Sequence, residues 1–230
     1  MDIHKPKPWH GVREFLKEYV IIVVGVLTAL GAEQVVEGIR TREAVHALRD
    51  SLRTELIENR ARWEANRSQD DCVAKRLDAI LAWAATSPPQ ALTTLVGVPI
   101  TYNVHASAWD SAKANPASIH MPPAEHSLYA QQYDGLAGSQ RDLDIEHRGW
   151  IEIQSLLEQG DSPEDKRALR KLVIVEKDAL ARRRSNYAKV FARFDALHIP
   201  AEPQTLVSPH GQTLLCAPLV TAPARRGQNG

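Results

Sequence analysis

Fourteen consecutive residues without a charged side chain, from Tyr19 to Ala32, constrain this chain more than any other feature. A helix of that length spans about 21 Å, whereas the hydrocarbon core of a bilayer is about 30 Å thick. The apolar pattern extends outward to Phe15 on one side and to Val36 on the other. The whole segment 15–36 would form a helix of about 33 Å, which is long enough to cross a membrane.

Three interpretations fit this segment. As a retained anchor, it places Tyr19 in the interfacial aromatic belt and lets the long side chain of Lys17 reach the polar surface. As a cleaved signal peptide, it follows a basic N-terminal region and offers small residues for a cut after Gly31 or Ala32. As a core helix of a soluble domain, its length is also typical. No proline follows before Pro88, so nothing interrupts the helix, and this continuity favours the retained anchor.

The distribution of basic residues predicts an orientation. Four lysines and arginines lie in residues 1–18 and three lie in residues 33–52. The positive-inside rule therefore favours a cytoplasmic N-terminus. We expect a single-pass protein of the inner (cell) membrane with four parts: a cytoplasmic arm, 1–14; a transmembrane anchor, 15–36; a periplasmic helical domain, 37–198; and a Pro/Gly-rich, mostly disordered tail, 199–230.

One side of the expected anchor carries small residues. On a wheel of 100° per residue, Glu18, Gly25, Ala29 and Ala32 lie within about 60° of each other. The pair Gly25 and Ala29 has the small-xxx-small spacing that lets two membrane helices approach closely. These four residues are our candidate helix-contact face in the membrane, although small residues are also common in membrane spans that make no such contact.

The stretch EYVIIVVGVLTALGAEQVVE and the charged helix after it resemble an uncharacterised family of small bacterial single-pass inner-membrane proteins. The matching residues are Glu18, Gly25, Leu27, Ala29, Leu30, Glu37, Leu48, Leu52, Glu55, Leu56 and Asn59. The resemblance covers about residues 14–65. It implies a retained anchor followed by a helical extramembrane part, and it carries no catalytic residues to this chain.

Apolar residues at helical spacing continue along the rest of the chain. The helix that leaves the anchor and runs to about Asn66 carries the stripe Val45, Leu48, Leu52, Leu56 and Trp63. A second amphipathic helix follows from Asp70, and a short one ends at Asn115 before a proline. We leave residues 90–105 undecided between a short helix and a loop.

Two seven-residue repeats predict a helical hairpin. One contains Tyr129, Leu136, Leu143, Trp150 and Leu157, and the other contains Val173, Leu180, Tyr187 and Phe194. Ser162 and Pro163 form an N-cap and a first helical position for the second helix, and the intervening turn is short enough to make the two helices antiparallel neighbours. Glycines at 135 and 138 allow a kink in the first helix. The fold class is therefore all-α, with an N-terminal transmembrane helix continuing into a helical body that ends in a long antiparallel αα-hairpin.

Composition excludes several classes of protein. The chain has 28 lysines and arginines and 28 acidic residues, so its formal net charge is zero and we expect no nucleic-acid partner. The two cysteines, Cys72 and Cys216, are too few for a disulfide framework, and we expect Cys72 to be a structural residue of a helix. The segment TLLCAPLV, within the tail, is apolar enough to dock on the helical body.

The strongest hint of chemistry is a short loop sequence. His120, Glu125 and His126 supply potential metal ligands, but three or four ligands must converge in a fixed geometry, and no further ligand is evident. Solvated loop histidines explain the pattern better, so we expect no metal and no cofactor.

Three other groups of residues have structural explanations. Glu146 and His147 fit polar positions beside the hairpin seam, and the run 182–184 of three arginines fits a solvated helix face. The tryptophans at 63, 83, 109 and 150 fit apolar core positions. No catalytic residue is therefore assigned.

The sequence thus favours a non-enzymatic function. We expect a membrane-anchored helical interaction or scaffold module whose surroundings are the lipid bilayer and which contacts either a second copy of itself or an unknown protein partner. A periplasmic ligand-sensing domain that works through a partner is the first alternative. A metal-dependent hydrolase that uses His120, Glu125 and His126 is the second.

Overall fold

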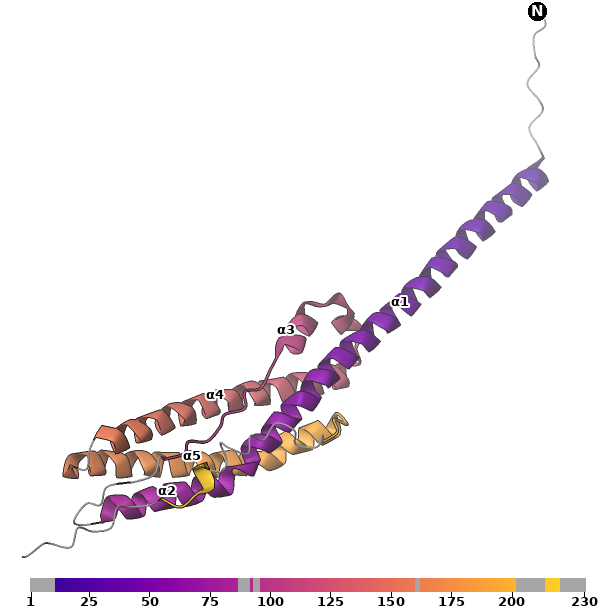
Figure 1. Cartoon of the computed structure of the whole chain (residues 1–230). Helices are drawn as coiled ribbons and strands as arrows, with labels where there is room; N and C mark the ends of the chain where they lie inside the picture. Colours follow the sequence, from indigo (N-terminus) through magenta and orange to yellow (C-terminus); the bar gives the residue numbers. More distant parts are fainter. Residues whose placement is uncertain (1–10, 87–91, 93–95, 160–161, 202–213, 220–230) are drawn as a thin grey trace, which may run out of the picture. The chain divides into compact units, whose positions relative to one another are not determined.

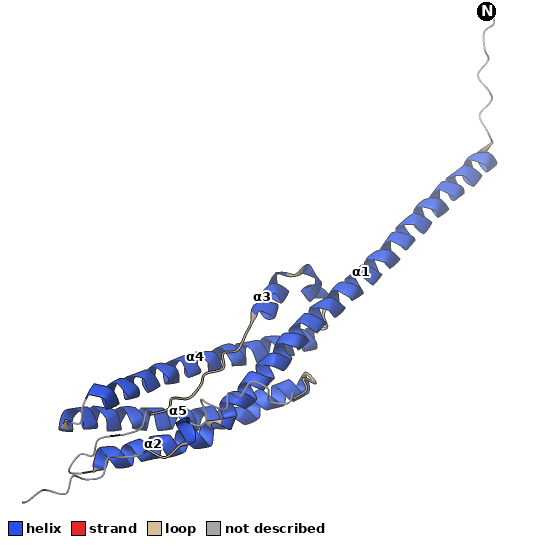
Figure 2. Cartoon of the chain, in the orientation of Figure 1, coloured by secondary structure: helices blue, strands red, loops and turns tan. Residues whose placement is uncertain are grey.

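The computed structural model describes residues 11–86, 92, 96–159, 162–201 and 214–219. These residues form helices and no β-strand, which confirms the all-α expectation (Figures 1 and 2). The elements are α1 (Val12–Ser68), α2 (Asp70–Ala85), α3 (Ser107–Ala114), the short 3-10 helix η1 (Pro116–His120), α4 (Pro123–Gln159) and α5 (Pro163–Ala196). The chain divides into two compact units, with the boundary between Arg49 and Asp50.

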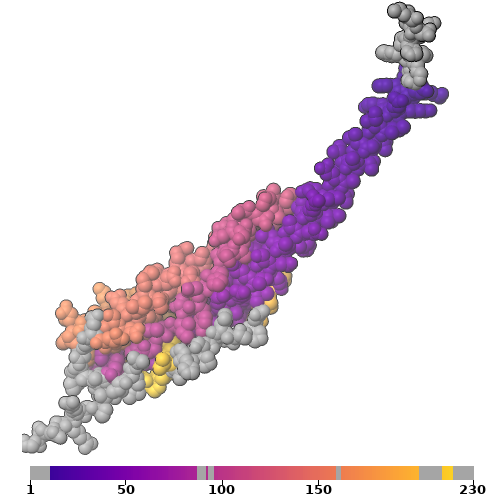
Figure 3. Space-filling model, turned by 45° about the horizontal axis from the view of Figure 1, so that its top comes forward, coloured from indigo at the N-terminus to yellow at the C-terminus, as the bar shows by residue number. Residues whose placement is uncertain are grey.

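The first unit contains the N-terminal part of α1. Its apolar side chains are exposed from Val12 to Ile39, and Figure 3 shows this indigo part of the helix on the surface. Among the described helices, the continuous stretch of α1 and α2 is long and apolar enough to span a membrane, and none of its most apolar window is buried. That exposure distinguishes the segment from the core helix of a soluble domain, whereas a signal sequence would share its length and composition.

The second unit is built around the antiparallel pair α4 and α5, and α5 also packs against α2 (Figure 1). The N-cap of α5 is the predicted one: the hydroxyl of Ser162 accepts a hydrogen bond of 3.1 Å from the backbone N–H of Asp165, and Pro163 follows. Helix α4 runs without interruption past Gly135 and Gly138, so no break in the helix occurs at these glycines.

The seven-residue repeats lie where the hairpin needs apolar side chains. Every member is buried except Leu157, which is half-buried; the buried ones are Tyr129, Leu136, Leu143, Trp150, Val173, Leu180, Tyr187 and Phe194. The stripe of α1 is buried as well, at Val45, Leu48, Leu52, Leu56 and Trp63. Trp63 meets Tyr187 edge-to-face with 5.7 Å between the ring centroids, which joins the stripe of α1 to the repeat of α5. All four tryptophans expected in the core are buried.

The C-terminal segment docks on α2. A turn of helix at 214–216 buries Leu215, and Arg76 of α2 donates hydrogen bonds to the carbonyl oxygens of Leu214, Leu215 and Ala217. At Gly97 a Cβ atom would lie 2.5 Å from the backbone of Leu214, so the close approach of the two segments requires glycine there. The expectation that TLLCAPLV docks on the body is confirmed for residues 214–219. The other residues after 201 lie outside the described part of the chain.

The two cysteines form a disulfide bond between Cys72 and Cys216 across a sequence separation of 144 residues. Cys72 is structural, as expected, but through a covalent bond rather than as a free thiol. Counting cysteines argued against a disulfide framework and overlooked this single bond, because two positions so far apart give no sequence signal of proximity. Closing so long a loop reduces the conformational freedom of the unfolded chain, and native disulfides of this kind contribute about 2–5 kcal/mol.

Candidate functional site

Three carboxamide side chains of the α1–α2 region hold an extended segment of backbone. Asn59 donates to the carbonyl oxygen of His105 at 2.7 Å and accepts from its N–H at 2.8 Å. Asn66 makes the same two-point contact with Tyr102, at 2.9 and 3.0 Å. Gln69, between the two helices, makes it with Ile100, at 2.9 Å in both directions. We call this set Asn59, Asn66 and Gln69 the amide ladder.

Two further side chains hydrogen-bond to the same segment and to the start of α3. Gln140 of α4 accepts a hydrogen bond of 2.9 Å from the N–H of Val104, so the segment is held from α4 as well as from α1. Glu55 of α1 accepts from the Ser107 hydroxyl at 2.6 Å and from the Ala108 N–H at 2.9 Å. Because the residue before α3 is Ala106, which has no capping side chain, Glu55 caps this helix from a distance. Residues 96–105, the described part of the segment 90–105 that the sequence left undecided beyond Leu92, are thus neither helix nor strand and are fixed by side chains.

A buried ion pair network joins α2, α4 and α5. The guanidinium of Arg183 binds Asp70 at 2.7 Å and also binds Glu146, and the side chains of all three are less than one-tenth exposed. The Tyr187 hydroxyl donates to the other carboxylate oxygen of Asp70 at 2.9 Å. Arg183 therefore contacts carboxylates from two helices while it belongs to a third.

The charges in this network shift one another's pKa values. Burial raises the pKa of Glu146, against the attraction of Arg183. Burial lowers the pKa of Arg183, but Glu146 and Asp70 outweigh it and the net shift is upward. Burial raises the pKa of Tyr187 because its hydroxyl is held away from water, so the phenol stays protonated and donates to Asp70. The two carboxylates therefore favour the charged form of the Arg183 guanidinium despite its burial.

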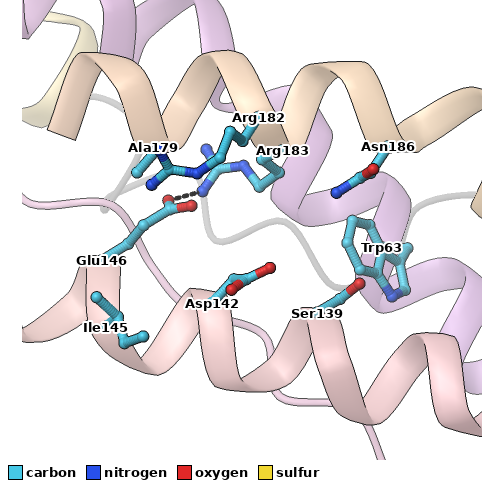
Figure 4. A pocket seen from close by; sticks show the side chains of 9 residues that line it. All are labelled: Trp63, Ser139, Asp142, Ile145, Glu146, Ala179, Arg182, Arg183 and Asn186. Carbon is cyan, nitrogen blue, oxygen red and sulfur yellow. Dashed lines mark hydrogen bonds and ion pairs between the residues drawn. The ribbon is translucent and has the colours of Figure 1, made fainter. Parts of the chain in front are cut away.

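Next to the ion pair lies a cavity of about 50 Å³ (Figure 4). Ser139, Asp142, Ile145 and Glu146 approach it from α4, whereas Ala179, Arg182, Arg183 and Asn186 approach from α5, and Trp63 closes the end. Three buried polar atoms of this lining have no hydrogen-bond partner within the described residues: Trp63 Nε1, Glu146 Oε1 and Arg183 Nε. Two N–H donors and one carboxyl oxygen thus remain free beside a space that can hold a few water molecules.

The candidate helix-contact face of the anchor is uncovered. Glu18, Gly25, Ala29 and Ala32 are exposed, and an added Cβ at Gly25 would meet no atom within 4 Å. The structure describes one chain, so the proposed contact between two anchors stays a prediction.

The histidine-containing loop is dispersed in the structure. His120 is exposed at the end of η1, and the half-buried His126 lies against the ring of Trp109 at 5.4 Å between centroids. Glu125 is half-buried at the start of α4. Within the described residues no group of three or more His, Cys, Asp and Glu side chains is arranged to hold a metal ion.

The three consecutive arginines do not share one environment. Arg182 and Arg184 are exposed and bind Asp178 and Asp71, as a solvated face predicts. Arg183 points inward, and this part of the expectation was wrong. The signal that was missed is the spacing of Arg183, which lies three residues after Leu180 and four residues before Tyr187. In a heptad repeat, the position three residues after one core position is itself a core position, so this spacing predicts that Arg183 points inward. Glu146 has the same spacing between Leu143 and Trp150.

Comparisons with protein-family models, with curated proteins and with solved structures give no match for this chain.

Removing one rung of the amide ladder should destabilise the domain. In Asn66→Ala the N–H and carbonyl of Tyr102 lose both partners, and we expect the free energy of unfolding to fall by about 2–4 kcal/mol. Urea denaturation of the full-length protein in detergent measures the loss. The matched control is Gln131→Ala, because Gln131 is exposed and its side chain, among the described residues, bonds to Ser127 one turn away; its effect should stay below about 0.5 kcal/mol. Equal losses in the two variants would contradict the ladder.

The neighbouring arginines allow a second test. Arg183→Met removes the guanidinium from two buried carboxylates, so we expect a loss of about 3–5 kcal/mol in the same denaturation experiment. Arg182→Met removes an exposed ion pair and should cost less than about 1 kcal/mol. A small loss in Arg183→Met, similar to that of Arg182→Met, would show that the buried network does not hold the helices together.

Proposed function

We propose that this protein is a single-pass membrane-anchored helical interaction module. Its anchor is residues 15–36, its N-terminal arm is cytoplasmic and its helical domain lies on the outer side of the membrane. The observation that carries this proposal is the exposed apolar surface of α1 from Val12 to Ile39, which ends just before a charged helical body. Exposed apolar area of this extent is unfavourable in water and favourable in lipid.

The disulfide supports the orientation. Disulfide bonds persist in oxidising compartments and are rare in the cytosol, where thiols are kept reduced. A bond between Cys72 and Cys216 therefore favours a domain outside the cytoplasm. This agrees with the excess of basic residues before the anchor and with the resemblance to small bacterial inner-membrane proteins, which motivates the assignment to an inner membrane.

An interaction role follows from what the anchor and the domain offer. The anchor presents the face of Glu18, Gly25, Ala29 and Ala32 to the bilayer, where another helix of the same kind can pack closely. We propose that this face binds a second copy of the chain or a partner with a similar anchor. No catalytic role is proposed for any residue, and the metal-dependent hydrolase is not pursued because the loop of His120, Glu125 and His126 is dispersed.

Ligand sensing is the second candidate function. The observation that favours it is the cavity with three unpartnered buried polar atoms, since a small polar molecule would satisfy the groups that the described residues leave free. Such a domain would pass its signal to a partner protein.

Expression with a C-terminal reporter that is active only outside the cytoplasm tests the anchor and its orientation. We expect an active reporter, an intact mass that includes residues 15–36, membrane pelleting that resists carbonate, and cysteines that react with a thiol reagent only after reduction. A soluble product that lacks about the first 31 residues would identify a signal peptide instead. An inactive reporter with reactive thiols would reverse the orientation.

Self-association through the anchor is tested by cross-linking in membranes. Gly25→Leu fills the small-residue face, so we expect the yield of cross-linked dimer to fall several-fold. Val20→Leu is the control, because it also introduces a leucine but Val20 lies on the opposite side of the helix. An unchanged dimer yield in Gly25→Leu would remove the anchor face as the site of contact.

A further inference from the structure

The buried charges where α2, α4 and α5 meet do not balance. Three carboxyl groups are almost fully buried there: Asp70 at 4% exposure, Glu146 at 6% and Glu176 at 4%. The cation buried with them is Arg183, whose side chain is 9% exposed. Because each uncompensated buried charge costs several kcal/mol, three carboxylates and one guanidinium cannot all be ionised there without a large penalty.

The neighbouring arginines of α5 bind mainly exposed carboxylates, and one of them also reaches the site. On α5, Arg182 binds Asp178, and Arg184 binds the exposed Asp71 of α2 at 2.8 Å and reaches Asp70 at 3.5 Å. Tyr187 donates its hydroxyl to Asp70.

The charged groups of α4 and the docked segment complete the surroundings. Asp142 and His147 of α4 are exposed and line the cavities on either side of the junction, and residues 99–101, which also line the junction, carry no charge. Arg183 is thus divided between Asp70 and Glu146, and Glu176 is the carboxyl that no ion pair of the described residues compensates.

Glu176 is seated against the backbone of α4. Its carboxyl group occupies the space that a Cβ atom would need at Gly149, so the absence of a side chain there is what admits it. Gly149 lies three residues, or about one helical turn, after Glu146 on α4, so Glu176 of α5 meets α4 about one turn away from Glu146. The two carboxyl groups therefore share one buried site between α4 and α5.

Cavities that can hold water adjoin Glu146 on two sides. Glu146 and Arg183 line both the cavity of about 50 Å³ and a second cavity of about 20 Å³, which lies toward Gln69 and Ile100. The ion pair is the partition between the two cavities. Each of its members keeps one unpartnered atom, Glu146 Oε1 and Arg183 Nε, so a water molecule in a cavity has polar groups to bind and can carry a proton to or from Glu146.

We propose that Glu146 and Glu176 form a proton-binding site in which the two carboxyl groups share one proton, and that loss of this proton loosens the docking of α5 on α4. With the proton bound, Arg183 faces two carboxylates rather than three, and Glu176 rests on Gly149 without repelling Glu146. Without the proton, two negative charges face each other across neighbouring helices. The partition formed by Glu146 and Arg183 then opens, and the two cavities hydrate as one.

The pKa shifts agree in direction with this arrangement. Burial, and then the charge of Glu146, raise the pKa of Glu176 to about 7, despite Arg183 and Arg182. Burial also raises the pKa of Glu146. The charge of Glu146 contributes to the raised pKa of Glu176, so ionisation of the two groups is coupled.

The sign of the resulting pH dependence is fixed. In the unfolded chain the Glu176 carboxyl ionises near pH 4.5, and in the folded domain near pH 7. Between these values the folded domain holds a proton that the unfolded chain has released. The stabilisation is therefore complete below about pH 4.5 and is lost as the pH rises through 7.

Glu176→Gln tests the site, because the amide keeps the shape of the protonated carboxyl and cannot ionise. Urea denaturation of the full-length protein in detergent at pH 5 and pH 8 gives the unfolding constant. In the wild type we expect the Glu176 contribution to raise that constant on the order of 70-fold between these pH values. Glu176→Gln should remove most of this rise, whereas Glu152→Gln, at an exposed position of α4, should keep it. An equal rise in all three proteins would overturn the proposal.

Infrared difference spectra of the wild type between pH 6 and pH 9 provide a readout that needs no variant to fold. We expect a carbonyl band of a protonated carboxylic acid at pH 6 that disappears at pH 9 and is missing in Glu176→Gln. If the wild type shows no such band, no carboxyl holds a proton there and the proposal fails. A band that remains in Glu176→Gln and is lost in Glu146→Gln would place the proton on Glu146 alone and would also overturn the shared site.

Discussion

Arg183 carries a positive charge that must leave water when α5 docks on its neighbours. That transfer is tolerable only when Asp70 and Glu146 are both in place, because a buried guanidinium without partners costs several kcal/mol. The helices α2, α4 and α5 are thereby required to meet in one register. The apolar repeats supply most of the favourable burial, but they would tolerate a shift by one heptad, whereas the network would not. The ion pair network thus specifies the register of the packing that the apolar residues stabilise.

The sequence predicted the parts of the fold that repeat. Heptad spacing at Leu143, Trp150, Val173 and Leu180 gave the hairpin, and the uninterrupted pattern after the anchor gave the long helix α1. It did not predict the contacts between segments distant along the chain, such as Asn66 with Tyr102. The sequence does not show whether a carboxamide side chain on a helix face points to water or bonds to another backbone segment. It also does not show whether two cysteines distant along the chain lie close together in the fold. The charged residues Glu146 and Arg183 could have been recognised from the sequence. Each occupies the second core position of a heptad, where a charged residue is unusual.

The N-terminal part of α1 and the helical domain have surfaces that suit different surroundings. Along residues 19–32 of α1 the backbone groups are hydrogen-bonded within the helix and no side chain is charged, which suits lipid. In the domain, by contrast, many buried polar groups are bonded to particular partners, and three of the unpartnered buried atoms, on Trp63, Glu146 and Arg183, line the cavity of about 50 Å³. The chain therefore concentrates its specific polar contacts in the helical domain and its exposed apolar surface in the N-terminal part of α1, which is the division that the proposed membrane-anchored module needs.

The amide ladder recognises main chain and not side chains. Each carboxamide of the ladder bonds only to the backbone N–H and carbonyl of one residue, so nearly any residue with an extended backbone can occupy that position. In related chains, positions 100, 102 and 105 are then free to diverge, while the helix must keep Asn, six residues, Asn, two residues and Gln. Distant relatives of this domain can therefore be identified by this short spaced pattern rather than by similarity over the whole sequence.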